Sequence, residues 1–142
     1  MANRLYTAEA AADGPRTGRA YTADGRLDVQ LSLPASMGGD DGAGTNPEQL
    51  FAAGYAACFH SAMRLALGPL DLQLDALKGC TVTARVHLDT PGETTFDLAV
   101  DIEASLPALP KERAQQLMEA THQVCPYSRA TRGNVLVTLT AV

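Results

Sequence analysis

The sequence predicts an α+β domain in which an antiparallel sheet carries its helices on one face. Three observations lead to this fold class. Four segments alternate apolar and polar residues with the period of two that half-buried strands show. Two longer segments between them carry helix start signals, and several connections have the length of hairpin turns. The 142 residues fit a single domain over 1–142, and 46% apolar with 19% charged residues is typical of a globular protein.

The N-terminal part predicts a hairpin followed by a loop. Residues 27–33 alternate leucine and valine with polar side chains, and Pro34 ends this strand. Asp24-Gly25 just before it favours a tight turn back to a strand in 18–22. Residues 37–44 hold four glycines and two aspartates. This composition predicts a loop, either a plain connector or a flap over a site.

A long central helix is predicted to begin at residue 47. Asn46 suits the N-cap, Pro47 the first helical position and Glu48 the first turn. Alanine-rich sequence continues the helix through Leu67, and Gly68-Pro69 ends it. Several faces of this helix carry large apolar side chains: Leu50, Phe51, Tyr55, Phe59, Met63 and Leu65. We therefore expect burial on most sides, which in a small domain suggests a subunit interface.

The C-terminal half predicts two strands, a helix and a last strand. Residues 82–88 and 96–102 alternate apolar and polar positions on either side of a Pro-Gly turn, which indicates adjacent strands with one wet face. Pro110 begins a second helix that runs from Lys111 to about Val124. Alternating residues in 135–139 predict the final strand.

Charge and hydropathy exclude two classes of function. The formal net charge is −5 and no cluster of Lys or Arg interrupts it, which disfavours a nucleic-acid-binding protein. The most apolar stretch, residues 50–59, is half the roughly 20 residues that a transmembrane helix needs, so no membrane span is predicted. The N-terminus lacks the apolar core of a secretory signal, and we expect a cytoplasmic protein.

Three cysteines, Cys58, Cys80 and Cys125, are an odd number in a chain large enough to fold without disulfides, which argues against a disulfide framework. None of them stands in a CxxC pair, which disfavours a structural zinc site. Cys58 lies about three turns into the central helix, where a core role is the commoner one. A reactive thiolate there would need a neighbouring cation, since the helix dipole acts only at the first turn. Cys125 precedes Pro126 at a helix end, which suits a resolving thiol, whereas Cys80 suits an inert buried thiol. The candidate cations are Arg16, Arg19, Arg26, Arg64, Arg129 and Arg132.

A metal site is the alternative use of these residues. His122 and Cys125 share a helical face, and Cys58 with His60 would have to supply the other ligands. Residues two apart on a helix point about 200° away from each other, so Cys58 and His60 do not face one ion. We therefore expect no metal, and we interpret His60 and His87 as ordinary partly buried side chains.

Two long motifs resemble a known protein family. They are TNPEQLFAAGYAACF at 45–59 and HQVCPYS at 122–128, the second followed by ATRGN at 130–134. Together they resemble the organic hydroperoxide resistance branch of the Ohr/OsmC family of thiol-dependent peroxidases. The resemblance runs from the N-terminal strands to the last strand. It implies antiparallel sheets around a long buried central helix, in an intertwined homodimer.

The resemblance also implies the roles of four residues. Cys58 corresponds to the peroxidatic thiolate and Cys125 to the resolving cysteine, while Glu48 and Arg16 correspond to the pair that holds the thiolate. Arg16 stands in GPRTG at 14–18, where the family usually has two glycines before the arginine, so Arg19 is the alternative. An arginine beside the thiol would lower its pKa, and a glutamate would orient the guanidinium.

The implied function is reduction of alkyl and fatty-acid hydroperoxides to alcohols without a metal or other cofactor. Cys58 would form a sulfenic acid and then a disulfide with Cys125, and a dihydrolipoyl-type dithiol would reduce that disulfide. Apolar residues near Cys58 would hold the organic tail of the substrate, unless they simply belong to the core. These candidate substrate contacts are Phe51, Tyr55, Phe59 and Met63.

Glu48 and Cys58 are ten residues apart, about 15 Å along a straight helix. One arginine can link them only if it reaches from another element, the helix bends near Gly54, or the glutamate comes from a partner subunit. We expect Arg16 to come from a neighbouring strand and the site to lie at a dimer interface. The competing functions are a redox sensor and a small-molecule-binding domain, neither of which would turn over peroxide with a dithiol.

Overall fold

The computed structural model describes residues 2–142, and none of the helices in this range is long and apolar enough to cross a membrane. The chain divides into two compact units, Met1–Pro47 and Glu48–Val142. Each unit is described by itself below. The single domain over 1–142 stays a prediction.

The first unit contains a three-stranded antiparallel sheet, β1 (Ala11–Asp13), β2 (Arg19–Tyr21) and β3 (Asp28–Gln30). The predicted hairpin around Asp24-Gly25 is confirmed, since β2 pairs with β3 and Gly25 adopts a φ of 74°. The strand is shorter than the predicted 27–33, because pairing with β2 ends at residue 30. The predicted loop is confirmed as well, and a short 3-10 helix leads into it, η1 (Ala35–Met37).

The central helix is α1 (Pro47–Ala66), and its predicted start is confirmed. Two 3-10 turns follow, η2 (Gly68–Leu70) and η3 (Leu74–Leu77). The remaining elements are β4 (Thr81–Asp89), β5 (Asp97–Ser105), α2 (Lys111–Val124), α3 (Pro126–Thr131) and β6 (Leu136–Ala141). The two strands, the second helix and the last strand are confirmed, whereas α3 was not predicted.

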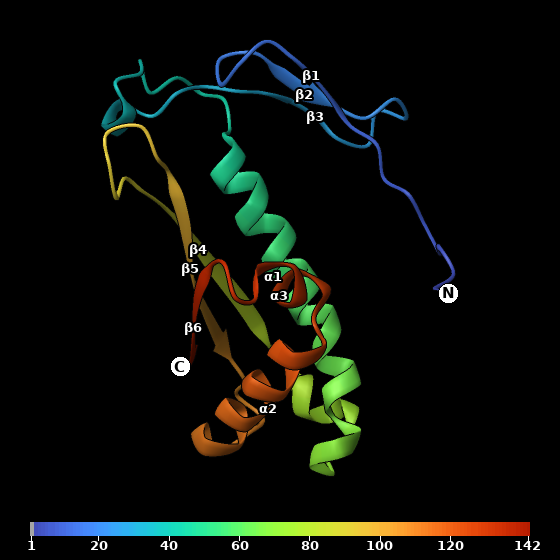
Figure 1. The fold of residues 1–142 in the computed structure, drawn as a ribbon. Helices are drawn as coiled ribbons and strands as arrows, with labels where there is room; N and C mark the ends of the chain where they lie inside the picture. Colours follow the sequence, from blue (N-terminus) through green and yellow to red (C-terminus); the bar gives the residue numbers. More distant parts are fainter. Residues whose placement is uncertain (1) are drawn as a thin grey trace. The chain divides into compact units, whose positions relative to one another are not determined.

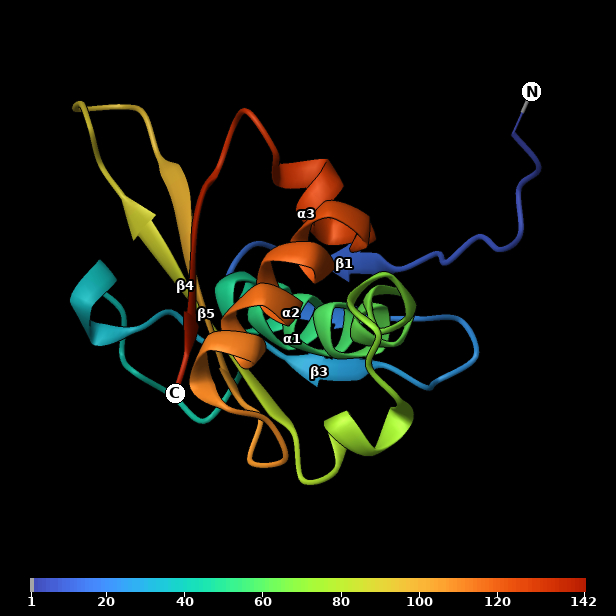
Figure 2. The ribbon, with the colours of Figure 1, turned by 90° about the horizontal axis from the view of Figure 1, so that it is seen from below.

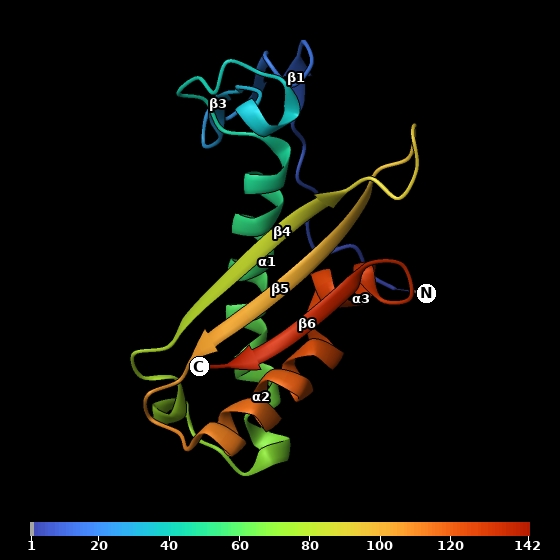
Figure 3. The ribbon, with the colours of Figure 1, turned by 90° about the vertical axis from the view of Figure 1, so that its left-hand side faces the viewer.

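The sheet of the second unit has the order β4-β5-β6 (Figure 3). β4 and β5 form the predicted antiparallel hairpin, with Val86 opposite Val100. β6 instead lies parallel to β5, with Val137 also beside Val100. The cause is the connection, because α2 and α3 return the chain to the end of the sheet from which β5 started. The sheet is therefore mixed rather than antiparallel throughout.

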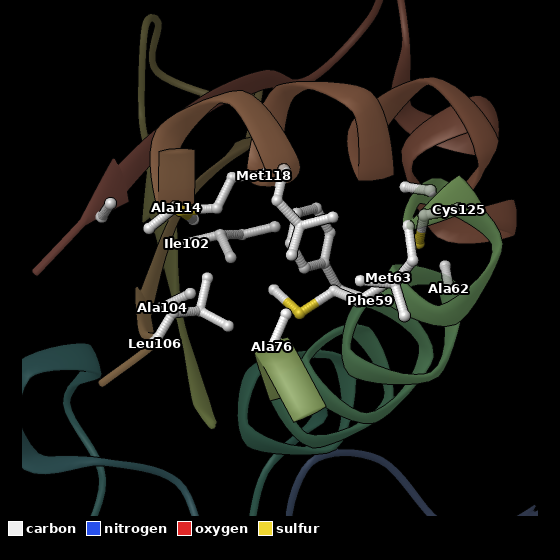
Figure 4. Packing of buried hydrophobic residues seen from close by; sticks show 14 of the residues in the cluster. Phe59, Ala62, Met63, Ala76, Ile102, Ala104, Leu106, Ala114, Met118 and Cys125 are labelled. Atoms are coloured by element: carbon white, nitrogen blue, oxygen red, sulfur yellow. The ribbon is translucent and has the colours of Figure 1, made fainter. Parts of the chain in front are cut away.

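The core of the second unit lies between this sheet and the helices α1 and α2, which share one of its faces (Figure 2). Phe59 and Met63 of α1 meet Ile102 of β5 and Met118 of α2 there (Figure 4). The opposite face of α1 differs from the sequence-based expectation of burial on most sides. This face is exposed and is formed mainly of small residues. It also carries one large apolar side chain, Leu65, which is 68% exposed.

Candidate active site

Two thiols that are 67 residues apart in the sequence meet in the second unit. Cys58 lies on α1, whose course is visible in Figure 1, and Cys125 lies at the junction of α2 and α3. Their Sγ atoms are 3.7 Å apart and both thiols are reduced. The sulfurs need to approach by only roughly 1.7 Å to reach the ~2.05 Å of a disulfide bond.

The backbone around Cys125 explains its position. Its N–H donates to the carbonyl of Thr121 at 2.9 Å and closes α2, while its carbonyl accepts from the N–H of Arg129 at 2.9 Å and opens α3. Its own backbone is extended, with φ −65° and ψ 126°, and Pro126 occupies the first position of α3. This break between two helices turns the Cys125 side chain into the core, where it is fully buried.

The surroundings of Cys58 favour its neutral form. Burial raises the pKa of this thiol, and its hydrogen bond with Cys125 raises it further. One group acts in the opposite direction, since the backbone N–H of Tyr127 donates to Cys58 and lowers its pKa. Cys58 therefore gains little thiolate from these neighbours, and an added cation would be needed to activate it.

Aromatic rings surround this part of α1. The ring centroid of Phe51 lies 6.2 Å from that of Tyr55 and 6.0 Å from that of Tyr127, in edge-to-face contact. Tyr127 packs over Gly54, where an added Cβ would lie 2.7 Å from the tyrosine hydroxyl oxygen. Tyr127 is 38% exposed and Phe51 is half-buried, so both are accessible to a ligand.

The other predicted substrate contacts have a different environment. Tyr55, Phe59 and Met63 are completely buried, and they belong to the core cluster of the second unit. Their burial fits the core alternative, because a side chain without exposed surface contacts a ligand only if its neighbours move. Tyr127 was not predicted as a contact, although its place two residues after Cys125 was a signal that could have suggested it.

Cys80, His60 and His122 make other contacts within the second unit. Cys80 Sγ contacts Met63 Sδ at 3.7 Å, and the backbone carbonyl of Cys80 is 3.2 Å from Nε2 of His60. Nδ1 of His122 is 2.7 Å from the hydroxyl oxygen of Ser128 rather than directed at Cys125. Over residues 2–142, no group of three or more His, Cys, Asp or Glu side chains is placed to hold a metal ion.

His122 provides a test of stability against pH. Burial, and secondarily the charge of Arg132, lowers the pKa of His122 below its usual 6.5, so the unfolded chain takes up this proton first as the pH falls. The contribution of neutral His122 to stability is therefore present above pH 6.5 and lost as the pH falls through the lowered value. We expect urea midpoints to fall less steeply with pH in His122→Gln than in the unmodified protein. An equal slope in both proteins would contradict this expectation.

The two arginines that the family resemblance singles out, Arg16 and Arg19, lie in the first unit. Arg19 forms a two-pronged ion pair with Asp28, with Nε and a terminal nitrogen each 2.7 Å from one carboxylate oxygen. Its guanidinium also lies 4.4 Å from the ring centroid of Tyr21. The hydrogen bond to Asp28 raises the pKa of Arg19. Arg16 is half-buried in the connection between β1 and β2. Asp28 thus engages Arg19, and the assignment of Arg16 as the catalytic arginine stays a prediction.

Glu48 lies in the first turn of α1 and is half-buried. Helix α1 continues without interruption from residue 47 to residue 66, so Glu48 and Cys58 lie about 15 Å apart along its axis. The structure thus brings Cys58, Cys125 and Tyr127 together, while Glu48 starts the same helix almost three turns earlier.

The chain is similar to known proteins over most of its length. A family model described as OsmC-like protein matches residues 38–140. An organic hydroperoxide resistance protein of Xanthomonas axonopodis pv. citri is 44% identical, over 96% of this chain and 94% of that protein. The crystal structure of an organic hydroperoxide resistance protein from Legionella pneumophila matches with a TM-score of 0.88 at 43% identity, over 98% of both chains. That of OhrB from Bacillus subtilis matches with a TM-score of 0.84 at 39% identity, over 98% of this chain and 100% of that chain.

Proposed function

Because this chain belongs to the OsmC-like family and, within it, to the organic hydroperoxide resistance proteins, we propose that it is a thiol peroxidase that reduces organic hydroperoxides. A role in organic hydroperoxide resistance follows from its relatives. The observation that carries the finer proposal is the 3.7 Å separation of the Cys58 and Cys125 sulfurs. Two reduced thiols at this distance can be oxidised to a disulfide and reduced again with little movement of the fold.

The proposed cycle has three steps. The Cys58 thiolate attacks one oxygen of the hydroperoxide, an S–O bond forms as the O–O bond breaks, and the alkoxide leaves as an alcohol after taking up a proton. Cys125 then attacks the sulfenic sulfur of Cys58, an S–S bond forms, and the hydroxide leaves as water after protonation. Finally a dithiol of the dihydrolipoyl type reduces the disulfide and becomes a disulfide itself.

We further propose that Arg16 and Glu48 activate Cys58, with a second copy of the chain completing the site. The need for a cation supports this proposal, since burial raises the pKa of Cys58. The helical separation of Glu48 from Cys58 also supports a contribution from outside α1. The exposed face of α1, with Leu65, gives a homodimer a surface to cover. Light scattering of the purified protein measures its oligomeric state directly, and a monomer would contradict the shared site.

Mass spectrometry tests the peroxidase cycle. We expect pre-reduced protein to lose two hydrogens on reaction with one equivalent of cumene hydroperoxide, through a Cys58–Cys125 link that dihydrolipoamide reverses. Cys125→Ser should instead stop at the Cys58 sulfenic acid and oxidise further with excess peroxide. If the link forms but peroxide is not consumed repeatedly with dithiol, the redox-sensor alternative is favoured. An unchanged mass would favour a binding domain.

A pair of arginine variants tests the activation of Cys58. We expect Arg16→Met to slow the reaction of Cys58 with hydroperoxide by on the order of 10²-fold, because the thiolate and the developing oxygen charge lose a positive donor. Arg19→Met is the matched variant on the same hairpin, and it should keep the rate because Arg19 is paired with Asp28. Stopped-flow measurement of the first oxidation step gives both rates. If Arg19→Met slows the first oxidation step and Arg16→Met does not, Arg19 is the arginine that activates Cys58.

A further inference from the structure

A chain of buried and half-buried polar side chains links the elements that carry the two cysteines. It consists of Tyr55, His122, Ser128 and Thr131, which we call the hydroxyl chain. Tyr55 Oη lies 2.8 Å from Ser128 Oγ and 3.3 Å from Thr131 Oγ1, and Ser128 Oγ lies 2.7 Å from Nδ1 of His122. Tyr55 and Ser128 are fully buried, Thr131 is nearly so and His122 is half-buried.

Counting hydrogens gives the hydroxyl chain a direction. Thr131 donates its one hydroxyl hydrogen to the backbone carbonyl of Ser128 at 3.1 Å, so its oxygen accepts from Tyr55. Tyr55 then has no hydrogen left for Ser128, so Ser128 donates to Tyr55 and its own oxygen accepts from His122. In this order every bond has one donor and one acceptor. His122 therefore carries a hydrogen on Nδ1.

The members of the hydroxyl chain are close in sequence to the two cysteines. Tyr55 is one helical turn before Cys58 on α1, while His122 and Ser128 are three residues before and after Cys125. Arg132 adds a further tie, since its guanidinium donates to the backbone carbonyl of His122 at 2.7 Å. The α2–α3 junction is thus fastened to α1 by directional bonds as well as by packing.

We propose that the hydroxyl chain positions Cys125 against Cys58 and thereby sets the rate of disulfide formation relative to overoxidation. The proposal rests on the proposed function, because it concerns the second step of that cycle. Apolar packing alone tolerates small sliding of α3 along α1, whereas hydrogen bonds with a fixed donor order restrict it. Within residues 2–142, none of the four side chains forms a hydrogen bond to either reacting sulfur, and we assign them as positioning residues. Without them, the Cys58 sulfenic acid persists long enough to react with a second hydroperoxide and form a sulfinic acid.

Single-hydroxyl variants test this role. Tyr55→Phe keeps the ring and removes its hydroxyl, and Thr131→Val keeps the shape of threonine and removes its hydroxyl. We expect both to slow disulfide formation by roughly 10- to 100-fold, the cost of misplacing reacting groups by up to ~1 Å. The first oxidation of Cys58 should keep its rate in Thr131→Val. Stopped-flow kinetics separates the two, because only the first step depends on peroxide concentration, and mass spectrometry gives the ratio of sulfinic acid to disulfide.

Matched variants distinguish positioning from a purely structural role. Thr131→Ser keeps the hydroxyl and should restore the ratio, and Tyr6→Phe removes an exposed hydroxyl and should not change it. A merely structural role would lower the thermal midpoint without changing the ratio in folded protein, and that result would overturn the proposal. If Tyr55→Phe fails to fold, Thr131→Val and Thr131→Ser still distinguish a positioning role from a purely structural one. If the unmodified protein forms no Cys58–Cys125 disulfide, it is the proposed function that fails instead.

Discussion

Replacing Cys58 with serine is expected to reduce hydroperoxide consumption by on the order of 10³-fold or more. An alcohol at this position is far less nucleophilic than a thiolate, and no other described cysteine can replace it, since Cys125 is fully buried. Steady-state consumption of cumene hydroperoxide with dihydrolipoamide measures the loss. The folded state should be retained, because serine is close to cysteine in size.

Cys80→Ser is the matched control for this variant. Cys80 contacts Met63 on the other side of α1, and burial raises the pKa of its thiol, so it has neither the place nor the charge to react. We expect this variant to consume hydroperoxide at the unmodified rate. Loss of activity in Cys80→Ser with activity retained in Cys58→Ser would move the reactive thiol away from the Cys58–Cys125 pair.

Phe59→Ala is expected to destabilise the fold by about 3–5 kcal/mol, the usual cost of truncating a buried phenylalanine. Its ring is fully buried in the core between α1, β5 and α2. This is a large part of the roughly 5–15 kcal/mol that stabilises a typical domain. Denaturant unfolding monitored by circular dichroism gives the difference in unfolding free energy.

Phe96→Ala separates the effect of burial from that of losing an aromatic ring. Phe96 is 61% exposed, so the same substitution should change stability by only about 0.5 kcal/mol or less. The pair also decides between the two roles considered for Phe59. If Phe59→Ala kept its stability and raised KM for bulky hydroperoxides, Phe59 would belong to the substrate pocket.

Elements with strong local signals were predictable from the sequence. Asn46-Pro47 fixed the start of α1, and the Asp24-Gly25 turn fixed the hairpin of β2 and β3. The direction of β6 was not predictable from its alternation, because the same pattern suits either orientation and only the route of the connection decides. Helix α3 is six residues long, too short for helical periodicity to show.

The thiol pair was predictable only through the motifs that resemble the family. Periodicity places Cys58 on a helix and Cys125 at a helix end, but it contains no information on a contact across 67 residues. The packing of Tyr127 over Gly54 could not be predicted from the sequence for a similar reason. A glycine inside a helix suggests a close approach without naming the residue that approaches. Ser128 and Thr131 looked like ordinary polar residues because their burial follows from the fold.

The parallel pairing of β6 with β5 has a consequence for folding. Val100 pairs with Val137 across a segment that contains both α2 and α3, and such non-local contacts form late because a long loop must close first. Until the chain between Cys58 and Cys125 has folded, either cysteine can pair with Cys80 instead. Oxidising conditions during synthesis or refolding would therefore trap misfolded chains. We therefore expect refolding under reducing conditions to give more native protein than refolding under oxidising conditions.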